Sequence, residues 1–117
     1  MVEGPVGCLS VVMPCFNEGA TVLVIIDRVL ASEYVTELVV VDDGSTDSTP
    51  ELVASVTDPR IRLIRQPENL GKGAALRRGF AEVTGPYVVV QDTALDYSPT
   101  EPGTPRHHSL AGPALLL

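Results

Sequence analysis

The sequence has no tryptophan, and aromatic residues make up only 4% of its 117 residues. So few aromatic side chains offer few platforms on which nucleic-acid bases stack. Basic residues are also scarce, because 8 lysines and arginines stand against 15 aspartates and glutamates, for a formal net charge of −7. Proteins that bind the phosphate backbone of nucleic acids present clustered positive charge. We therefore expect no nucleic-acid partner.

Long apolar runs and a disulfide framework are missing as well. No stretch approaches the roughly 20 apolar residues of a membrane-spanning helix, and the first residues lack the basic and apolar segments of a signal peptide. Cys8 and Cys15 fall within and just beyond one expected strand, roughly 20 Å apart, which is too far for a disulfide. Unpaired thiols are typical of a reducing compartment. The sequence predicts a cytoplasmic protein, peripheral at most to the inner face of a membrane.

What the sequence does contain is an alternation of short apolar runs and amphipathic stretches. Four runs rich in β-branched residues predict strands, at 9–13, 38–41, 60–65 and 87–90. Three stretches between them predict helices, at 20–30, 50–56 and 74–83. Pro14 is expected to end the first strand, and Leu76, Phe80 and Val83 are expected to lie on one side of the third helix. The order βαβαβαβ predicts an α/β, Rossmann-like fold: a parallel sheet with helices on both faces.

The composition changes near residue 98. Residues 98–117 hold four of the ten prolines and both histidines, with no helix or strand period. Such a segment has little apolar surface to offset the entropy of ordering it. We expect one folded domain over residues 1–97 and a disordered tail over residues 98–117.

Polar residues follow the expected strands. The apolar run 38–41 leads directly into a pair of aspartates and then into Ser48 and Thr49, either of which is a suitable cap for the next helix. Open α/β sheets place their ligands at this carboxyl edge, although a capped turn without further function also fits this stretch alone. The segment 71–73, Gly-Lys-Gly, completes neither a dinucleotide-binding pattern nor a phosphate loop. A dehydrogenase or a P-loop NTPase is therefore disfavoured.

Four segments taken together carry a family resemblance. They read VVMPCFNE at 11–18, VVVDDGSTDST at 39–49, NLGKGAALRRGF at 69–80 and VVVQDTALDYSP at 88–99. In this order and spacing they resemble the N-terminal, donor-binding half of glycosyltransferase family 2, which includes enzymes similar to dolichyl-phosphate mannose synthase and bacterial polyprenyl-phosphate sugar transferases. The resemblance implies a GT-A fold, a nucleotide-diphosphate sugar as donor, Mg²⁺ or Mn²⁺ as cofactor, and a polyprenyl phosphate at the membrane surface as a candidate acceptor.

The resemblance also implies roles for individual residues. It places Pro14, Asn17 and Glu18 in the base and ribose pocket, and it makes Asp42 the acceptor of hydrogen bonds from the base or the ribose. The adjoining turn is shaped by Asp43, Gly44 and Ser45. Near the donor diphosphate it places Lys72 and Gly73, and at the metal it places Asp92, with Asp96 as a secondary ligand.

The sequence departs from the family pattern in two places. The acidic pair Asp-x-Asp that holds the family's metal reads Asp92-Thr93-Ala94, so the second carboxylate is missing. The family's acceptor region follows this motif, where the present chain has the proline-rich segment instead. We expect a glycosyltransferase that is truncated and weakly active or inactive as it stands. A non-catalytic nucleotide-binding fragment or pseudoenzyme, and a nucleotidyltransferase, remain alternatives.

Overall fold

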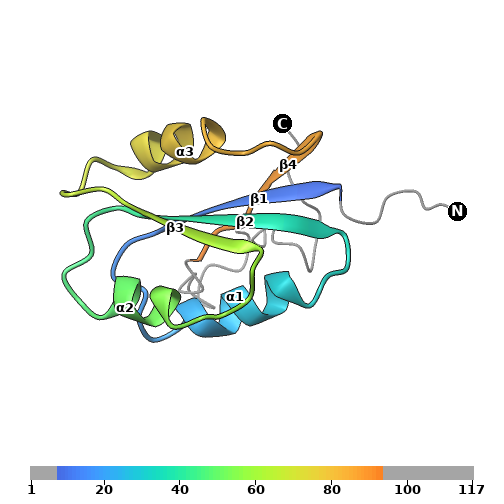
Figure 1. Ribbon diagram of the computed structural model, residues 1–117. Coiled ribbons are helices and arrows are strands. Elements are labelled where there is room, and N and C mark those ends of the chain that lie inside the picture. Colours follow the sequence, from blue (N-terminus) through green and yellow to red (C-terminus); the bar gives the residue numbers. More distant parts are fainter. Residues whose placement is uncertain (1–7, 94–117) are drawn as a thin grey trace, which may run out of the picture.

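A computed structural model describes residues 8–93, which contain four strands and three helices (Figure 1). In chain order the elements are β1 (Leu9–Cys15), α1 (Val22–Leu30), β2 (Val35–Asp42), α2 (Thr49–Ala54), β3 (Ile61–Arg65), α3 (Lys72–Phe80) and β4 (Tyr87–Val90). This order confirms the expected βαβαβαβ alternation. The expectation of a disordered tail and the candidate ligand Asp96 lie outside the described residues.

The four strands form one parallel sheet in the order β3-β2-β1-β4. The chain moves outward from β1 through β2 to β3, and it then crosses back to place β4 on the other side of β1. The connection that leaves β1 therefore leads to one side of this strand, whereas the crossover from β3 leads to the other. In open α/β sheets such a reversal of strand order opens a crevice for ligands.

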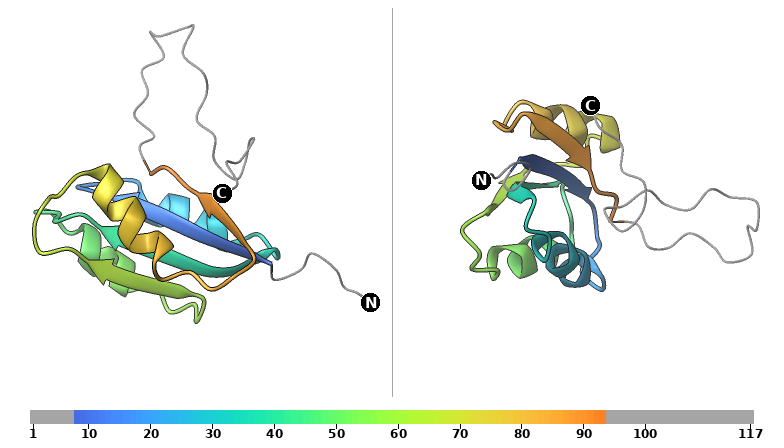
Figure 2. Two further views of the ribbon diagram at one scale, coloured as in Figure 1. Left: turned by 90° about the horizontal axis from the view of Figure 1, so that it is seen from above. Right: turned by 90° about the vertical axis from the view of Figure 1, so that its right-hand side faces the viewer.

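Helices cover both faces of the sheet, as Figure 2 shows: α1 and α2 lie on one face and α3 on the other. Side chains of β2 alternate between the two layers. Leu38 and Val40 join the cluster under α1 and α2, whereas Val39 and Val41 join the cluster under α3. All four side chains are fully buried. The uninterrupted apolar run in the sequence is thus explained by cover on both sides.

Helix α3 packs on the sheet through small residues. Its buried positions are Ala75 and Gly79, and a Cβ atom on Gly79 would lie 2.4 Å from Cγ1 of Val12 in β1. The absence of a side chain at Gly79 therefore lets the helix backbone approach the strands. Leu76 and Phe80, expected on one side of this helix, are only partly buried.

Strand β1 continues through Pro14, contrary to the expectation that proline ends it. The carbonyl oxygen of Pro14 accepts a hydrogen bond from the Thr93 hydroxyl at 3.1 Å, so this residue turns its polar atoms toward the β4 side. The paired part of β4 ends at Val90, opposite Val12. No ladder hydrogen bond from the nitrogen of Pro14 is needed there, which is why proline is tolerated.

Candidate functional site

A cavity of about 310 Å³ lies at the carboxyl edge of the sheet, between the ends of β1 and β4. Its walls come from four segments: the ends of β1, β2 and β4, and the start of α3. The lining residues are Pro14, Cys15, Phe16, Glu18, Asp43, Asn69, Gly71, Lys72, Ala75, Asp92 and Thr93. The volume is at the lower end of the range for small-molecule sites.

Asn17 joins the loop after β1 to the loop after β2. Its side-chain oxygen accepts hydrogen bonds from the backbone N–H groups of Thr46 at 2.8 Å and Asp47 at 3.2 Å. Its own backbone N–H donates to the Ser45 hydroxyl oxygen at 2.8 Å. The backbone of Asn17 has φ of 52°, a left-handed conformation that asparagine tolerates better than most residues. Asn17 thus holds two walls together and does not itself line the cavity.

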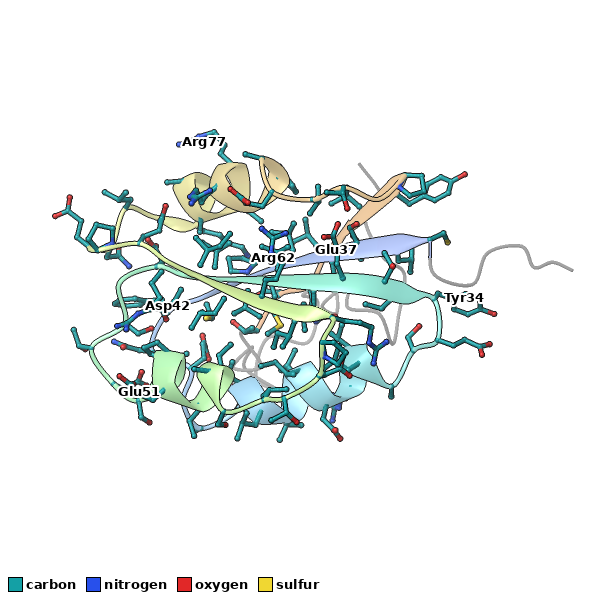
Figure 3. All side chains as sticks on the ribbon, in the orientation of Figure 1. Tyr34, Glu37, Asp42, Glu51, Arg62 and Arg77 are labelled. Carbon is teal, nitrogen blue, oxygen red and sulfur yellow. The ribbon has the colours of Figure 1, made fainter. Side chains whose placement is uncertain are left out.

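Asp42 lies at the end of β2 (Figure 3), and it is buried, with 1% of its surface exposed. Its carboxylate accepts hydrogen bonds from the backbone N–H of Ser45 at 3.0 Å and from the Ser45 hydroxyl. The thiol of Cys15 donates to it at 3.8 Å. Burial raises the pKa of the Cys15 thiol, and the charge of Asp42 and the hydrogen bond to it raise this pKa further. The thiol therefore stays protonated as a donor, and Asp42 holds the turn outside the cavity lining.

Asp43 does line the cavity, and it fixes the loop before α3. Its carboxylate accepts hydrogen bonds from the backbone N–H groups of Leu70 at 2.8 Å and Gly71 at 2.9 Å, and from the Gln66 side chain at 2.9 Å. Gly44 allows the two loops to meet, because a Cβ atom on it would lie 2.5 Å from the backbone nitrogen of Asn69. Its φ of 78° also favours glycine.

Two further contacts close the ring of loops around the cavity. The Nζ atom of Lys72, the first residue of α3, lies 3.1 Å from Oδ2 of Asp92 after β4. Next to Asp92, the Thr93 hydroxyl donates to the carbonyl of Pro14 in β1. Each of the four segments is thereby bonded to the next.

The start of α2 is capped in a way that the sequence did not predict. The N-cap residue is Ser48, but neither its hydroxyl nor that of Thr49 caps the helix. The carboxylate of Asp47 instead accepts hydrogen bonds from the Thr49 hydroxyl and backbone N–H, and from the N–H of Gly19 at 3.2 Å. These bonds, led by the Thr49 hydroxyl, lower the pKa of Asp47. Asp47 therefore connects α2 to the loop after β1.

Comparison with known proteins identifies the family at this point. The sequence profile of glycosyl transferase family 2 matches residues 10–99, which include all four walls of the cavity. The chain belongs to glycosyl transferase family 2. The elements of this GT-A fold are a parallel sheet and interleaved helices, as expected from the sequence.

Three similar proteins illustrate the relationship. The succinoglycan biosynthesis protein ExoO of Rhizobium meliloti is 42% identical over 86 residues, which are 73% of this chain and 25% of ExoO. The undecaprenyl-phosphate 4-deoxy-4-formamido-L-arabinose transferase of Yersinia pestis is 35% identical over 109 residues, 87% of this chain and 33% of that enzyme. A mannosyltransferase of Pyrobaculum calidifontis, solved in complex with GDP-Man and Mn²⁺, is 31% identical with a TM-score of 0.67, covering 73% of this chain and 27% of that one.

The chain therefore spans only about a quarter to a third of the length of these family 2 proteins. Within the part that the structure describes, no helix has both the length and the apolar character required to cross a membrane. The similarity thus concerns one portion of each relative, and in this chain the matched residues 10–99 include the whole cavity lining.

The structure places the residues singled out from the family 2 motifs in two groups. Five line the cavity: Pro14, Glu18, Asp43, Lys72 and Asp92. Four others lie outside the lining and hold or shape the surrounding turns: Asn17, Asp42, Gly44 and Ser45. Gly73 lies in the first turn of α3, also outside the lining. Which of them bind a ligand stays a prediction.

Sequence reasoning gave no role in the site to six of the lining residues, among them Phe16 and Thr93. Phe16 is 41% exposed although it is aromatic, and it borders the cavity. Its position directly after Pro14 and Cys15, in one of the four motifs, was an available signal. Thr93 carries no comparable signal, because its bond to Pro14 joins residues 79 positions apart.

The residues that the structure describes do not form a metal site by themselves. No group of three or more histidine, cysteine, aspartate or glutamate side chains with metal-binding geometry occurs among residues 8–93. The carboxylate of Asp92 already accepts a hydrogen bond from the ammonium group of Lys72. A single carboxylate is a poor match for Mg²⁺ or Mn²⁺ unless phosphates and waters complete the shell. The side chains on this part of the chain therefore do not by themselves fit the cation that the family resemblance implies.

Proposed function

We propose that residues 8–93 form the donor-binding part of a glycosyltransferase that uses a nucleotide-diphosphate sugar. The observation that carries this proposal is the composition of the cavity at the reversal of strand order. One side offers an aromatic ring at Phe16, another a carboxylate at Asp43, and a third an ammonium group at Lys72. A nucleoside diphosphate presents the complementary groups: a flat base, base or ribose donors, and an anionic diphosphate.

Phe16 is the proposed stacking surface for the base. Stacking of a base on an aromatic side chain contributes about 1–3 kcal/mol, and Phe16 is the aromatic residue in the cavity lining. The carboxylate of Asp43 is the proposed acceptor for the base or the ribose. Its buried position makes an unpaired alternative costly, which favours discrimination among bases.

This assignment differs from the one based on sequence alone, which gave base or ribose recognition to Asp42. Asp42 is buried among its own partners, Ser45 and Cys15. We assign it the positioning of the turn that carries Asp43. Lys72 remains the proposed contact of the diphosphate, supported by its place at the N-terminus of α3, where a helix favours anions.

Titration with UDP, GDP, CDP and ADP, with and without Mn²⁺, tests the proposal. We expect Phe16→Leu and Asp43→Asn each to weaken the preferred nucleotide by about 1–3 kcal/mol. Tyr87→Leu is the matched control for the first variant, because Tyr87 is a 52% exposed aromatic residue at the opposite end of the sheet. A folded chain that binds none of these nucleotides contradicts the proposal.

The proposed acceptor of the sugar is inferred from similar proteins. Similarity to an undecaprenyl-phosphate sugar transferase supports a polyprenyl phosphate acceptor, and hence a location at the inner face of a membrane. The phosphate of such an acceptor is already an anionic nucleophile and does not strictly require a general base. It still requires a surface that orients it, and positioning contributes roughly 7–11 kcal/mol to a bimolecular step.

Because the chain spans a quarter to a third of its relatives, we propose that the 117 residues alone bind the donor weakly and transfer little sugar. Fusion to the remaining portion of a relative is the matching gain-of-function experiment. Robust transfer to a polyprenyl phosphate by the purified chain contradicts this part of the proposal.

One observation favours a second candidate function, a non-catalytic nucleotide-binding protein: Ala94 stands where the family has a second metal-binding carboxylate. Such a protein binds a nucleotide but never transfers sugar, even when fused to the remaining portion of a relative. The nucleotidyltransferase alternative receives no support from the family membership.

A further inference from the structure

The cavity carries an unfavourable charge for a diphosphate. Three carboxylates line it, those of Glu18, Asp43 and Asp92, and Lys72 is the one cation in the lining that the structure describes. Asp43 is compensated by the N–H groups of Leu70 and Gly71. The balance of charge next to the proposed diphosphate site therefore depends on the pair formed by Lys72 and Asp92.

The ion pair between Lys72 and Asp92 is exposed to solvent, so Lys72 can leave Asp92 for another anion. The side chain of Lys72 is 56% exposed and that of Asp92 is 30% exposed, at a separation of 3.1 Å. Ion pairs with this degree of exposure contribute little free energy, because water and salt screen them. A diphosphate carries more charge and more acceptor oxygens than one carboxylate, so it competes effectively for the same ammonium group.

The alternative counter-charge for the diphosphate is a divalent cation bound at Asp92. The side chains of residues 8–93 do not form a site for such a cation by themselves. Among the described residues that follow β4, Asp92 is the one with a carboxylate, and this carboxylate is ion-paired with Lys72. The next residue but one in the sequence is Ala94. A cation there would be held mainly by the diphosphate and by water, whereas the fold itself already supplies the ammonium group of Lys72.

We propose that Lys72 is an exchangeable counter-charge that pairs with Asp92 until a diphosphate takes it, so that diphosphate binding in this chain does not require a divalent cation. The inference rests on the proposed function and deepens it. It predicts whether the carboxylate of Asp92 weakens or strengthens diphosphate binding. With no metal present, Asp92 opposes diphosphate binding twice, by holding Lys72 and by repelling the anion. A metal ligand has the opposite effect.

The test uses the whole chain and two probes, inorganic pyrophosphate and the preferred nucleoside diphosphate, titrated by calorimetry in EDTA and again in Mn²⁺. We expect Asp92→Asn to tighten pyrophosphate binding in EDTA by roughly two- to tenfold, a range that corresponds to release of an exposed ion pair and loss of a like charge. Lys72→Gln should weaken it by about tenfold. In the double variant the gain from Asp92→Asn should shrink, because no lysine remains to be released.

Asp27→Asn and Arg28→Gln are matched controls. Both residues are exposed on α1, on the other face of the sheet, and the two substitutions change the net charge by the same amounts. An equal gain from Asp27→Asn overturns the proposal, because the effect is then one of total charge. Thermal unfolding of each variant shows whether the fold is kept, and Asp92→Ser replaces Asp92→Asn if the latter does not fold.

The outcomes separate this inference from the proposed function. Wild-type binding of a nucleoside diphosphate in Mn²⁺ but not in EDTA, lost in Asp92→Asn, overturns the inference and leaves the proposed function standing. Binding in both conditions that strengthens in Asp92→Asn supports both. A folded wild-type chain that binds no probe in either condition overturns both.

Discussion

Asp42 and Asp43 are neighbours in the sequence but have different surroundings. The carboxylate of Asp42 is enclosed by Ser45 and Cys15, whereas that of Asp43 borders the cavity and accepts three N–H groups from residues 66–71. An ionised group in a protein interior is tolerated only with such partners. Each aspartate therefore has a structural task in addition to any contact with a ligand.

We expect Asp42→Ala to lower the free energy of unfolding by about 1–3 kcal/mol, because the partly buried N–H and hydroxyl groups of Ser45 lose their acceptor. Urea denaturation measures the effect, and Glu33→Ala, which removes an exposed carboxylate from a loop, is the control. If Asp42→Ala left the stability unchanged and abolished nucleotide binding, Asp42 would instead be a ligand contact, as the sequence alone suggested.

At the scale of elements, helix α3 connects the sheet to the cavity. Its first residue, Lys72, borders the cavity, and Gly79 near its end sits directly on Val12 and Val41. The position of Lys72 relative to Asp92 therefore depends on how closely the other end of the helix packs. A change in that packing is expected to move the N-terminus of α3 as well.

Gly79→Ala should destabilise the protein by roughly 1–3 kcal/mol, because the added methyl group would lie 2.4 Å from Cγ1 of Val12 and the helix must shift. Gly73→Ala, in the same helix, is the matched control. A Cβ atom there would meet only a guanidinium nitrogen of Arg77 at 3.5 Å, and alanine stabilises a helix by up to about 1 kcal/mol relative to glycine. Equal urea midpoints for the two variants would refute close packing at Gly79.

Arg60 connects three elements at the opposite edge of the sheet. Its guanidinium group donates to the carbonyl oxygens of Leu30 at 2.7 Å, Ser32 at 3.3 Å and Val35 at 3.1 Å. It also forms an ion pair with Asp58. The end of α1, the start of β2 and the segment before β3 thus share one side chain.

Arg60→Gln is expected to lower the free energy of unfolding by about 1–3 kcal/mol, because several carbonyl groups lose a charged donor. Arg60→Lys keeps the charge but not the planar fork, and it should retain only part of the stability. Chemical denaturation of both variants provides the measurement. Wild-type stability in Arg60→Gln would show that water replaces these hydrogen bonds at no cost.

At the scale of the whole molecule, a network of charges joins the sheet to the end of α3. Figure 3 shows Arg62 of β3 beside Glu37 of β2. Their charged atoms lie 3.7 Å apart, and Arg62 also pairs with Glu82 at 2.8 Å. Glu82 in turn pairs with Arg78 of α3. Burial alone would raise the pKa of Glu37, but hydrogen bonds from Ser10 and Thr84 lower it overall. The arginine partners, Arg78 first, lower the pKa of Glu82.

These shifts predict a loss of stability in acid. A carboxyl group whose pKa is lower in the folded than in the unfolded protein stabilises the fold above its unfolded pKa, and this stabilisation is lost as the pH falls through the folded pKa. The unfolded values are 4.5 for Glu37 and Glu82 and 3.8 for Asp58, whose pKa the hydrogen bonds and charge of Arg60 lower to about 2.

We therefore expect the free energy of unfolding to be constant from neutral pH to about 5 and to fall between roughly pH 4.5 and 2. Urea denaturation across this range measures it. Glu37→Gln should flatten the upper part of the decline, because one titrating group is removed. A stability that rises on acidification would contradict the sign of these shifts.

The sequence by itself determined the order of the elements, the parallel sheet and the edge at which the polar loops gather. These follow from local signals, because apolar periods of 2 and 3.6 residues and strand-ending polar residues act within a few positions of the chain. The four motifs, which span residues 11–99, were sufficient to indicate the family.

Only the tertiary structure decided which side chains face the cavity. The alternation of side chains between the two faces of β2 ends at its last residue, Asp42. No local pattern therefore shows whether Asp42 or Asp43 faces the cavity. Their contacts with Ser45 and with residues 66–71 decide this. The pairing of Lys72 with Asp92 joins residues 20 positions apart. Such contacts depend on the strand order β3-β2-β1-β4 and on how closely α3 packs at Gly79. Local periodicity is set by covalent geometry, whereas contacts between distant residues are set by the packing of the whole domain.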